Sequence, residues 1–333
     1  MTFDQIMADL KKKVYQPVYF LSGEETYYID AVSNFIAQNA LEEAERDFNQ
    51  VILYGRETDA GGIIEHAKRF PMMASHQVVI VKEAQNIRKI EALEVYLENP
   101  TPSTILVICY KYKKLDKRKA FTKLVAKSTA FLETKKMYDY QIPDWISQYL
   151  RSKKYKIQPR AALLLTDHLG TDLSKITNEL EKLFISVPEG SEINADHIEK
   201  NIGISKEYNT FELQDAIAKH NFVKANQIAM AFANNPKSYP LVVTLSTLFS
   251  FFVKVLSYHF LKDRSERNVA SVLKIHPFFV KVYTQAAGHY NAKRSVAIIS
   301  NLRDYDLRSK GVNNVSATDG ELLKELLFKI FHG

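Results

Sequence analysis

Few residues in this chain could form a covalent or metal-based site. Only one of its 333 residues is a cysteine, Cys109, so a disulfide framework is excluded. Because Cys109 lies in an apolar run, we expect it to be a small buried hydrophobic residue. The nine histidines are scattered, and the chain has no HExxH, GxSxG or GxGxxG motif. The sequence therefore predicts no catalytic site, no metal site and no cofactor.

Signals for export or membrane insertion are also missing. The N-terminal segment 1–14 is amphipathic and contains two acids, without the continuous apolar core of a signal peptide. The one long apolar stretch, 241–261, is interrupted by Thr, Ser, Lys and His residues and is too polar for a membrane span. We expect a bundle helix there, either central to its own bundle or packed against another subunit.

Residues 17–36 predict a strand, a tight turn and a helix, the local arrangement of many nucleotide-binding sites. An apolar run begins at Val18 and is ended by Gly23, and apolar residues then recur at helical spacing. A phosphate-binding loop needs a glycine-rich turn, a lysine, and a Ser or Thr for Mg²⁺. Here Glu24 and Glu25 stand where a triphosphate would need cations, and a like-charge pair at about 4 Å costs roughly 1 to 4 kcal/mol. We therefore predict that this turn binds no nucleotide and that the glutamates cap the helix.

The rest of the N-terminal part alternates strands with helices, as a parallel α/β domain does. Strands are expected at 48–53, 77–83 and 103–110, and helices at 61–70 and 91–98. In a nucleotide hydrolase, a buried strand such as 77–83 usually ends in acids that manage Mg²⁺ and water. Lys82 stands in that place here, and only Glu83 remains. A second part of a hydrolysis apparatus is therefore missing.

The most basic run, 111–121, carries six cationic residues and one acid. It is either a solvated connection into a helix, as charge runs usually are, or a contact for DNA or an acidic partner. The residues that would make such a contact are Lys113, Lys114, Lys117 and Arg118. The last part of the chain is basic as well, with 16 Lys and Arg against 9 Asp and Glu in residues 208–333.

From the first boundary, at 138–145, the pattern becomes helical, and a second boundary falls at 205–209. Between them, helices are expected at 143–153, 159–169, 171–185 and 194–202. Beyond the second boundary, they are expected at 211–219, 222–234, 240–262, 269–273, 277–287, 291–309 and 319–331. The chain therefore predicts an α/β domain at 1–140, a small helical domain at 141–207 and an all-α bundle at 208–333.

Several segments, taken in order, resemble the delta subunits of bacterial DNA polymerase III clamp loaders. They are PVYFLSGEETYYID, VVIVKEA, KLDKRKAF, GTDLSKITNELEKL, EYNTFELQDAI, DLRSKGVN and LLKELLFKI. Their order and spacing carry the resemblance, which covers nearly the whole chain. It implies an AAA+-like N-terminal domain without functional Walker motifs, a helical lid domain, and a C-terminal collar through which five loader subunits form a ring.

The resemblance also implies a function that needs no catalysis by this chain. A delta subunit binds the sliding clamp (the beta subunit) and opens it during DNA replication, without hydrolysing ATP itself. The implied partners are the clamp, the gamma or tau and delta prime subunits through the collar, and primed DNA in the assembled complex. The implied location is the bacterial cytoplasm, in association with the nucleoid.

The contact element that the resemblance implies lies just before strand 77–83. It consists of adjacent hydrophobic side chains, here Met72 and Met73, where many relatives have Leu-Phe. Methionine is apolar and flexible, which suits it to fill a hydrophobic pocket on the clamp. The alternative is that both methionines cover the local core. Phe70 belongs to the same element, and we expect it to pack inward as the anchor of the preceding helix.

Two other functions stay open on the sequence. One is an active AAA+ ATPase with an unconventional phosphate loop, which would require a cation in the turn 23–26. The other is a DNA-binding helical scaffold unrelated to clamps, which the basic last part of the chain favours.

Overall fold

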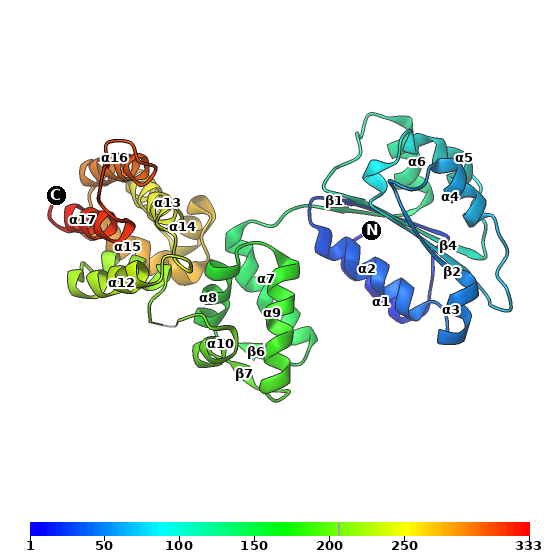
Figure 1. Ribbon diagram of the computed structural model, residues 1–333, viewed down its shortest axis with the longest axis horizontal. Helices are drawn as coiled ribbons and strands as arrows, with labels where there is room; N and C mark the ends of the chain where they lie inside the picture. Colours follow the sequence, from blue (N-terminus) through cyan, green and yellow to red (C-terminus); the bar gives the residue numbers. More distant parts are fainter. Residues whose placement is uncertain (206) are drawn as a thin grey trace. The chain divides into compact units, whose positions relative to one another are not determined.

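The computed structural model describes residues 1–205 and 207–333, in two compact units, Met1–Met137 and Tyr138–Gly333. Lys206, which falls in the predicted boundary at 205–209, lies outside the described residues. The first unit is α/β and the second is mainly helical (Figure 1), as the sequence predicts. The further division of the second unit into a lid domain and a collar stays a prediction.

A five-stranded parallel sheet forms the centre of the first unit, in the order β2-β3-β4-β1-β5. In that order the strands are Gln50–Tyr54, Gln77–Lys82, Thr104–Lys111, Val18–Gly23 and Ala130–Thr134. Leu21 of β1 lies opposite Cys109 of β4 and Leu132 of β5. Because all strands are parallel, their carboxyl ends meet at one edge, where open α/β sheets bind ligands.

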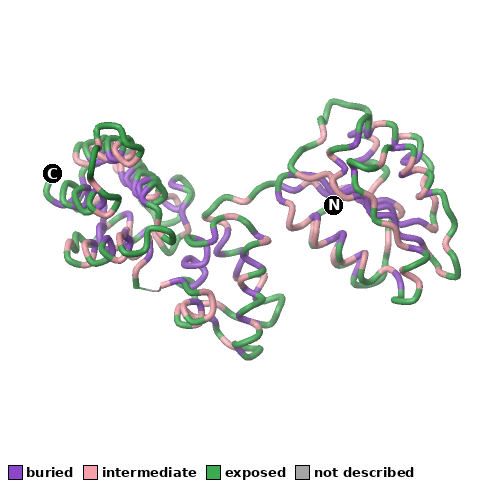
Figure 2. Tube along the Cα trace, in the orientation of Figure 1, coloured by how far each residue is buried: buried purple, intermediate pink, exposed green. Residues whose placement is uncertain are grey.

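Helices cover both faces of this sheet (Figure 1). One face packs against α1 (Phe3–Lys11) and α2 (Thr26–Asn39). The other packs against α4 (Ala60–Ala67), the 3₁₀ turn η2 (Ile90–Leu93), α5 (Glu94–Leu97) and α6 (Ala120–Ser128). The central strands are consequently buried on both sides (Figure 2), which explains their continuous apolar runs. Cys109 is fully buried as predicted, and burial raises the pKa of its thiol to about 11.

Four details of this unit differ from the expectation. The predicted strand at 48–53 starts only at Gln50, because Phe48 and Asn49 complete a short helix, α3 (Glu43–Asn49). The sequence analysis missed that helix, although Glu45 caps its start by accepting the N–H of Glu42 at 2.9 Å. It also missed β5, a short edge strand that follows α6 almost directly. The helix predicted at 61–70 ends at Ala67.

The first helices of the second unit lie within two residues of their predicted spans. They are α7 (Ile142–Ser152), α8 (Pro159–Leu169), α9 (Leu173–Ser186) and α10 (Ala195–Ile202). Asp172 and Asn194 cap the starts of α9 and α10 by accepting backbone N–H groups at 3.0 Å. This part also contains two short strands that the sequence does not predict, β6 (Lys156–Ile157) and β7 (Glu192–Ile193), which pair in parallel with each other.

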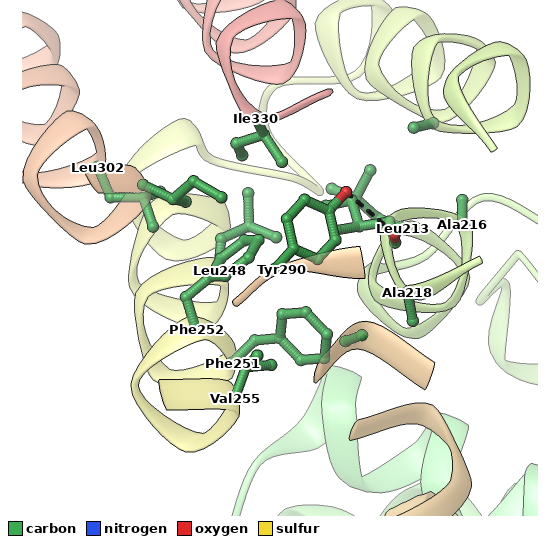
Figure 3. Close-up of a cluster of buried hydrophobic side chains, with 14 of the residues drawn as sticks. Leu213, Ala216, Ala218, Leu248, Phe251, Phe252, Val255, Tyr290, Leu302 and Ile330 are labelled. Carbon is green, nitrogen blue, oxygen red and sulfur yellow. Dashed lines mark hydrogen bonds between the residues drawn. The ribbon is translucent and has the colours of Figure 1, made fainter. Parts of the chain in front are cut away.

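The helices predicted for 208–333 are all present. They are α11 (Thr210–Ala218), α12 (Phe222–Asn234), α13 (Leu241–His259), α14 (Glu266–Leu273), α15 (Val280–His289) after the 3₁₀ turn η4 (Pro277–Phe279), α16 (Ala292–Ser309) and α17 (Asp319–His332). Tyr290 lies in their core beside Leu248, Phe251 and Phe252 (Figure 3). Its hydroxyl donates to the carbonyl oxygen of Ile217 at 3.2 Å, so the buried polar group is satisfied.

Helix α13 is long and apolar enough to cross a membrane by length and composition alone. Eight of its residues are buried, most of them in the core of the bundle, including Leu245, Leu248 and Phe252. It also leaves several large apolar side chains exposed, namely Val242, Val243, Phe249 and Val253. The helix is therefore central to its own bundle and still presents apolar surface.

Gly23 is the position of the sheet where a side chain is least tolerable. Its φ is +133°, and a Cβ there would lie 2.1 Å from the carbonyl oxygen of Thr134. We expect Gly23→Ala to lower the free energy of unfolding by about 2 to 4 kcal/mol, because β1 and β5 would be forced apart. Urea unfolding followed by circular dichroism measures this loss.

Gly61→Ala in α4 is the matched control in the same unit. A Cβ at Gly61 would meet only a carboxylate oxygen of Asp59, at 3.3 Å, and that side chain can move. The expected change is below about 1 kcal/mol, since alanine is the better helix former. Equal losses in the two variants would contradict the special role of Gly23.

Candidate functional site

The connection from β1 to α2, where a phosphate loop would lie, is short and already hydrogen-bonded. Only Glu24 and Glu25 separate the two elements. The N–H of Glu24 donates to the carbonyl oxygen of Thr134 at 3.3 Å, and the carbonyl oxygen of Gly23 accepts from the N–H of Tyr112 at 2.9 Å. A phosphate site needs several backbone N–H groups turned toward the anion. Within the turn, the N–H of Glu24 is therefore turned toward β5 and engaged there.

Both glutamates of the turn have structural roles. Glu25 is buried and caps α2, and its Oε1 accepts the N–H of Tyr27 at 3.1 Å. The predicted capping role is thus confirmed for Glu25. Glu24 instead forms an ion pair with Lys114, whose Nζ lies 3.2 Å from its carboxylate.

Asp30 of α2 binds two lysines that come from neighbouring strands. Its carboxylate lies 2.7 Å from Nζ of Lys111 in β4 and 3.9 Å from Nζ of Lys82 in β3. Lys82 also donates to the side chains of Ser33 and Asn34, at 3.0 and 3.2 Å. Both lysine side chains are no more than 20% exposed, so loss of their partner costs more than at the surface. Lys82 therefore ties the edge of the sheet to α2.

Carboxylates neutralise most of the basic run. Besides Lys111 and Lys114, three further cations form ion pairs: Lys117 with Glu133 at 3.0 Å, Arg118 with Asp116 at 2.9 Å, and Lys119 with Glu91 at 2.7 Å. For Lys113, the described part of the chain shows no carboxylate partner. These pairs weaken the positive field that would attract DNA. The geometry therefore fits the interpretation of a solvated connection, and the predicted DNA or subunit contact remains untested.

The predicted contact residues lie on the connection 68–76 between α4 and β3. Met73 is fully exposed, Met72 is 62% exposed and Phe70 is 83% exposed. The methionines therefore do not cover the core. The prediction that Phe70 packs inward is wrong, because α4 ends at Ala67 and Phe70 lies beyond its buried face.

Two buried amide side chains hold this connection, and the sequence analysis missed both. Asn49, at the end of α3, accepts the N–H of Met72 at 2.6 Å and donates to the carbonyl oxygen of Met72 at 2.9 Å. Gln77, at the start of β3, donates toward the end of α4 and to Oγ1 of Thr104 at 2.7 Å. The one signal in the sequence is that Gln77 stands directly before an apolar strand run and Asn49 one residue further from the next such run, at 51–53.

The backbone at Met73 is strained, with a φ of +56°. Residues other than glycine seldom adopt this left-handed conformation, which costs about 1 kcal/mol or more. Strain of this kind persists only where the surroundings impose it.

In the described ranges 1–205 and 207–333, no group of three or more His, Cys, Asp and Glu side chains could hold a metal ion.

The fold and these contacts define a class of protein: a parallel α/β domain followed by a mainly helical unit, with ion pairs within the chain at the carboxyl edge of its sheet. Comparison with known proteins narrows the class. The family model "DNA polymerase III, delta subunit" matches residues 19–135, and the model of the C-terminal domain of that subunit matches residues 207–329. The chain belongs to the family of DNA polymerase III delta subunits.

A match to a known sequence and a match to a solved structure agree with this assignment. DNA polymerase III subunit delta of Bacillus subtilis (strain 168) is 28% identical over 344 residues, which cover 99% of this chain and 96% of that protein. The solved structure of the Bacillus subtilis DNA clamp loader delta protein (YqeN) matches with a TM-score of 0.58 and 26% identity. That match covers 99% of both chains.

The ion pairs of Asp30 can be tested by changing charge without changing size. Asp30→Asn is expected to lower the free energy of unfolding by about 1 to 3 kcal/mol, because Lys82 and Lys111 would stay mostly buried without a carboxylate. Glu24→Gln, which breaks the exposed pair with Lys114, is the control and should cost less than about 1 kcal/mol. Urea unfolding measures both changes, and a smaller loss for Asp30→Asn than for the control would contradict the role given to Asp30.

Proposed function

We propose that this clamp loader subunit binds the sliding clamp through Met72 and Met73, favours the opened clamp, and hydrolyses no ATP itself. The observation that carries the proposal is the exposure of two adjacent apolar side chains on a connection whose backbone is held in place. Exposed apolar side chains grouped in this way are typical of protein interaction sites.

The binding energy of such an element comes from burial in a pocket of the partner. Burying one methionine side chain contributes about 1.5 to 3 kcal/mol. Two adjacent methionines would therefore form a small hot spot, around which weaker contacts exclude water. Phe70, exposed on the same connection, would extend this apolar contact.

Opening the clamp then requires differential affinity rather than covalent chemistry. A protein that binds the open clamp tens of times more tightly than the closed clamp shifts the equilibrium by about 2 kcal/mol. Loader subunits that bind ATP would control when Met72 and Met73 become accessible to the clamp. If those subunits bind and hydrolyse the ATP, this chain can keep the fold of a motor domain without a nucleotide site of its own.

The collar would supply the contacts with the other loader subunits, among them gamma or tau and delta prime. We assign this role to the apolar stripe on α13, where Val242, Phe249 and Val253 are exposed at spacings that place them on one face. Primed DNA would be a partner in the assembled complex. A contact of Lys113, Lys114, Lys117 or Arg118 with DNA or with a neighbouring subunit stays a prediction, as does association with the nucleoid in the cytoplasm.

The proposed contact through Met72 and Met73 is tested with purified sliding clamp from the same organism. The double variant Met72→Ala, Met73→Ala should bind the clamp at least tenfold more weakly in surface plasmon resonance, because the apolar anchor is lost. Met230→Ala, in α12, is the control, since Met230 is an exposed methionine of the other unit and its substitution should leave the affinity unchanged. Equal affinity of the double variant and the unaltered protein would show that the contact lies elsewhere.

The absence of ATP binding is tested on the chain alone. Isothermal titration calorimetry with ATP and Mg²⁺ should give no saturable binding up to about millimolar ATP, because the turn supplies no cation and the N–H of Glu24 is already bonded to Thr134. Measurable affinity that is abolished by Thr26→Ala would overturn this expectation. It would favour the alternative of an active ATPase with an unconventional phosphate loop.

A further inference from the structure

We propose that Asn49 is a positioning residue for clamp binding, which holds the backbone of Met72 so that Met72 and Met73 face outward before the clamp arrives. Asn49 is 5% exposed and is too deeply buried to contact a partner through its amide. The inference rests on the proposed function of the two methionines and concerns how the protein presents them.

The amide of Asn49 satisfies both backbone groups of a single residue. Its Oδ1 accepts the N–H of Met72 at 2.6 Å, and its Nδ2 donates to the carbonyl oxygen of the same residue at 2.9 Å. The second hydrogen of Nδ2 is directed to the carbonyl oxygen of Glu45, one turn earlier in α3, at 3.0 Å. The reversed amide would set Nδ2 against the N–H of Met72, so the network fixes the orientation.

Among the described residues, no other hydrogen bond holds the backbone of residues 70–76. In the described residues, residues 70–76 make no backbone-to-backbone hydrogen bond, and Pro71 has no N–H to donate. Gln77 and the end of α4 fix the two ends of the connection, and Asn49 fixes its middle. Because the side chain comes from α3, the connection is held against an element 23 residues earlier in the chain.

A fixed backbone matters for binding because a loose one is rarely in the binding conformation. The apparent dissociation constant is the intrinsic constant divided by the fraction of molecules that are competent to bind. Met73 is held at a φ of +56°, which a free chain seldom visits. Without Asn49 the competent fraction falls, and the clamp has to order the connection as it binds.

The test compares Asn49→Ala with Asn39→Ala in the full chain, with clamp affinity measured by surface plasmon resonance. Asn39 ends α2 as Asn49 ends α3, and its Nδ2 also donates to a carbonyl oxygen one turn earlier, that of Phe35 at 2.8 Å. It therefore reproduces the contact within the helix without the contact to Met72. We expect about 5- to 30-fold weaker clamp binding for Asn49→Ala and no change for the control.

Asn49→Asp keeps one of the two hydrogen bonds to Met72 and removes the other. A carboxylate can still accept the N–H of Met72, but it faces the carbonyl oxygens of Met72 and Glu45 with no hydrogen to offer. Clamp binding should therefore weaken as much as in Asn49→Ala. Unchanged affinity in both Asn49 variants would overturn the proposal.

A double-mutant cycle distinguishes this proposal from the proposed function. If Asn49 acts through the methionines, Asn49→Ala should cause no further loss in a chain that already carries Met72→Ala and Met73→Ala. If the methionine variant binds normally, the proposed function itself fails. If it binds weakly while Asn49→Ala binds normally, only the role of Asn49 fails.

Hydrogen exchange in the unaltered free protein tests the same contact without relying on a variant that folds. The amide of Met72 should exchange at least tenfold more slowly than those of Met73 and Ala74, because only the first donates to a buried acceptor. Equal exchange of the three amides would contradict the proposal.

Discussion

The carboxylate of Asp30, shared between Lys82 and Lys111, closes the edge of the sheet at which nucleotides bind in related folds. These ion pairs lie within the chain and join α2 to β3 and β4. The parallel sheet forms a rigid platform, whose buried strands hold the connections around them in fixed positions. At the neighbouring turn, the carboxylate of Glu25 is likewise engaged within the chain, because it caps α2.

The connection 68–76 is held in place by elements of that platform. Its ends are fixed to β3 and α4 through Gln77, and its middle is fixed to α3 through Asn49. Fixed in this way, it can expose Met72 and Met73 to water and still be well defined. Exposure and backbone strain are unfavourable in the free protein, and burial of both side chains against a partner would relieve the first of these costs.

Patterns along the chain are enough to predict the central strands and nearly all the helices of the second unit, because these depend on local periodicity and composition. The start of β2 was misplaced, since Phe48 reads as a strand residue although it completes α3. The prediction for Phe70 is wrong because the end of α4 depends on donors supplied by other elements, such as the amide of Gln77, which donates to the carbonyl oxygen of Ala67. The roles of Asn49 and Gln77 arise only from contacts between distant segments, which no periodicity encodes.

The central claim is that the functional surface lies on the connection 68–76 and not at the former nucleotide edge. Hydrogen exchange of the complex with the sliding clamp tests it most directly, by comparing amide protection with and without the clamp. The account predicts that the clamp slows exchange in a peptide covering residues 68–76 and leaves residues 22–30 unchanged. Protection of 22–30 or of the basic run 111–121, with none at 68–76, would contradict it.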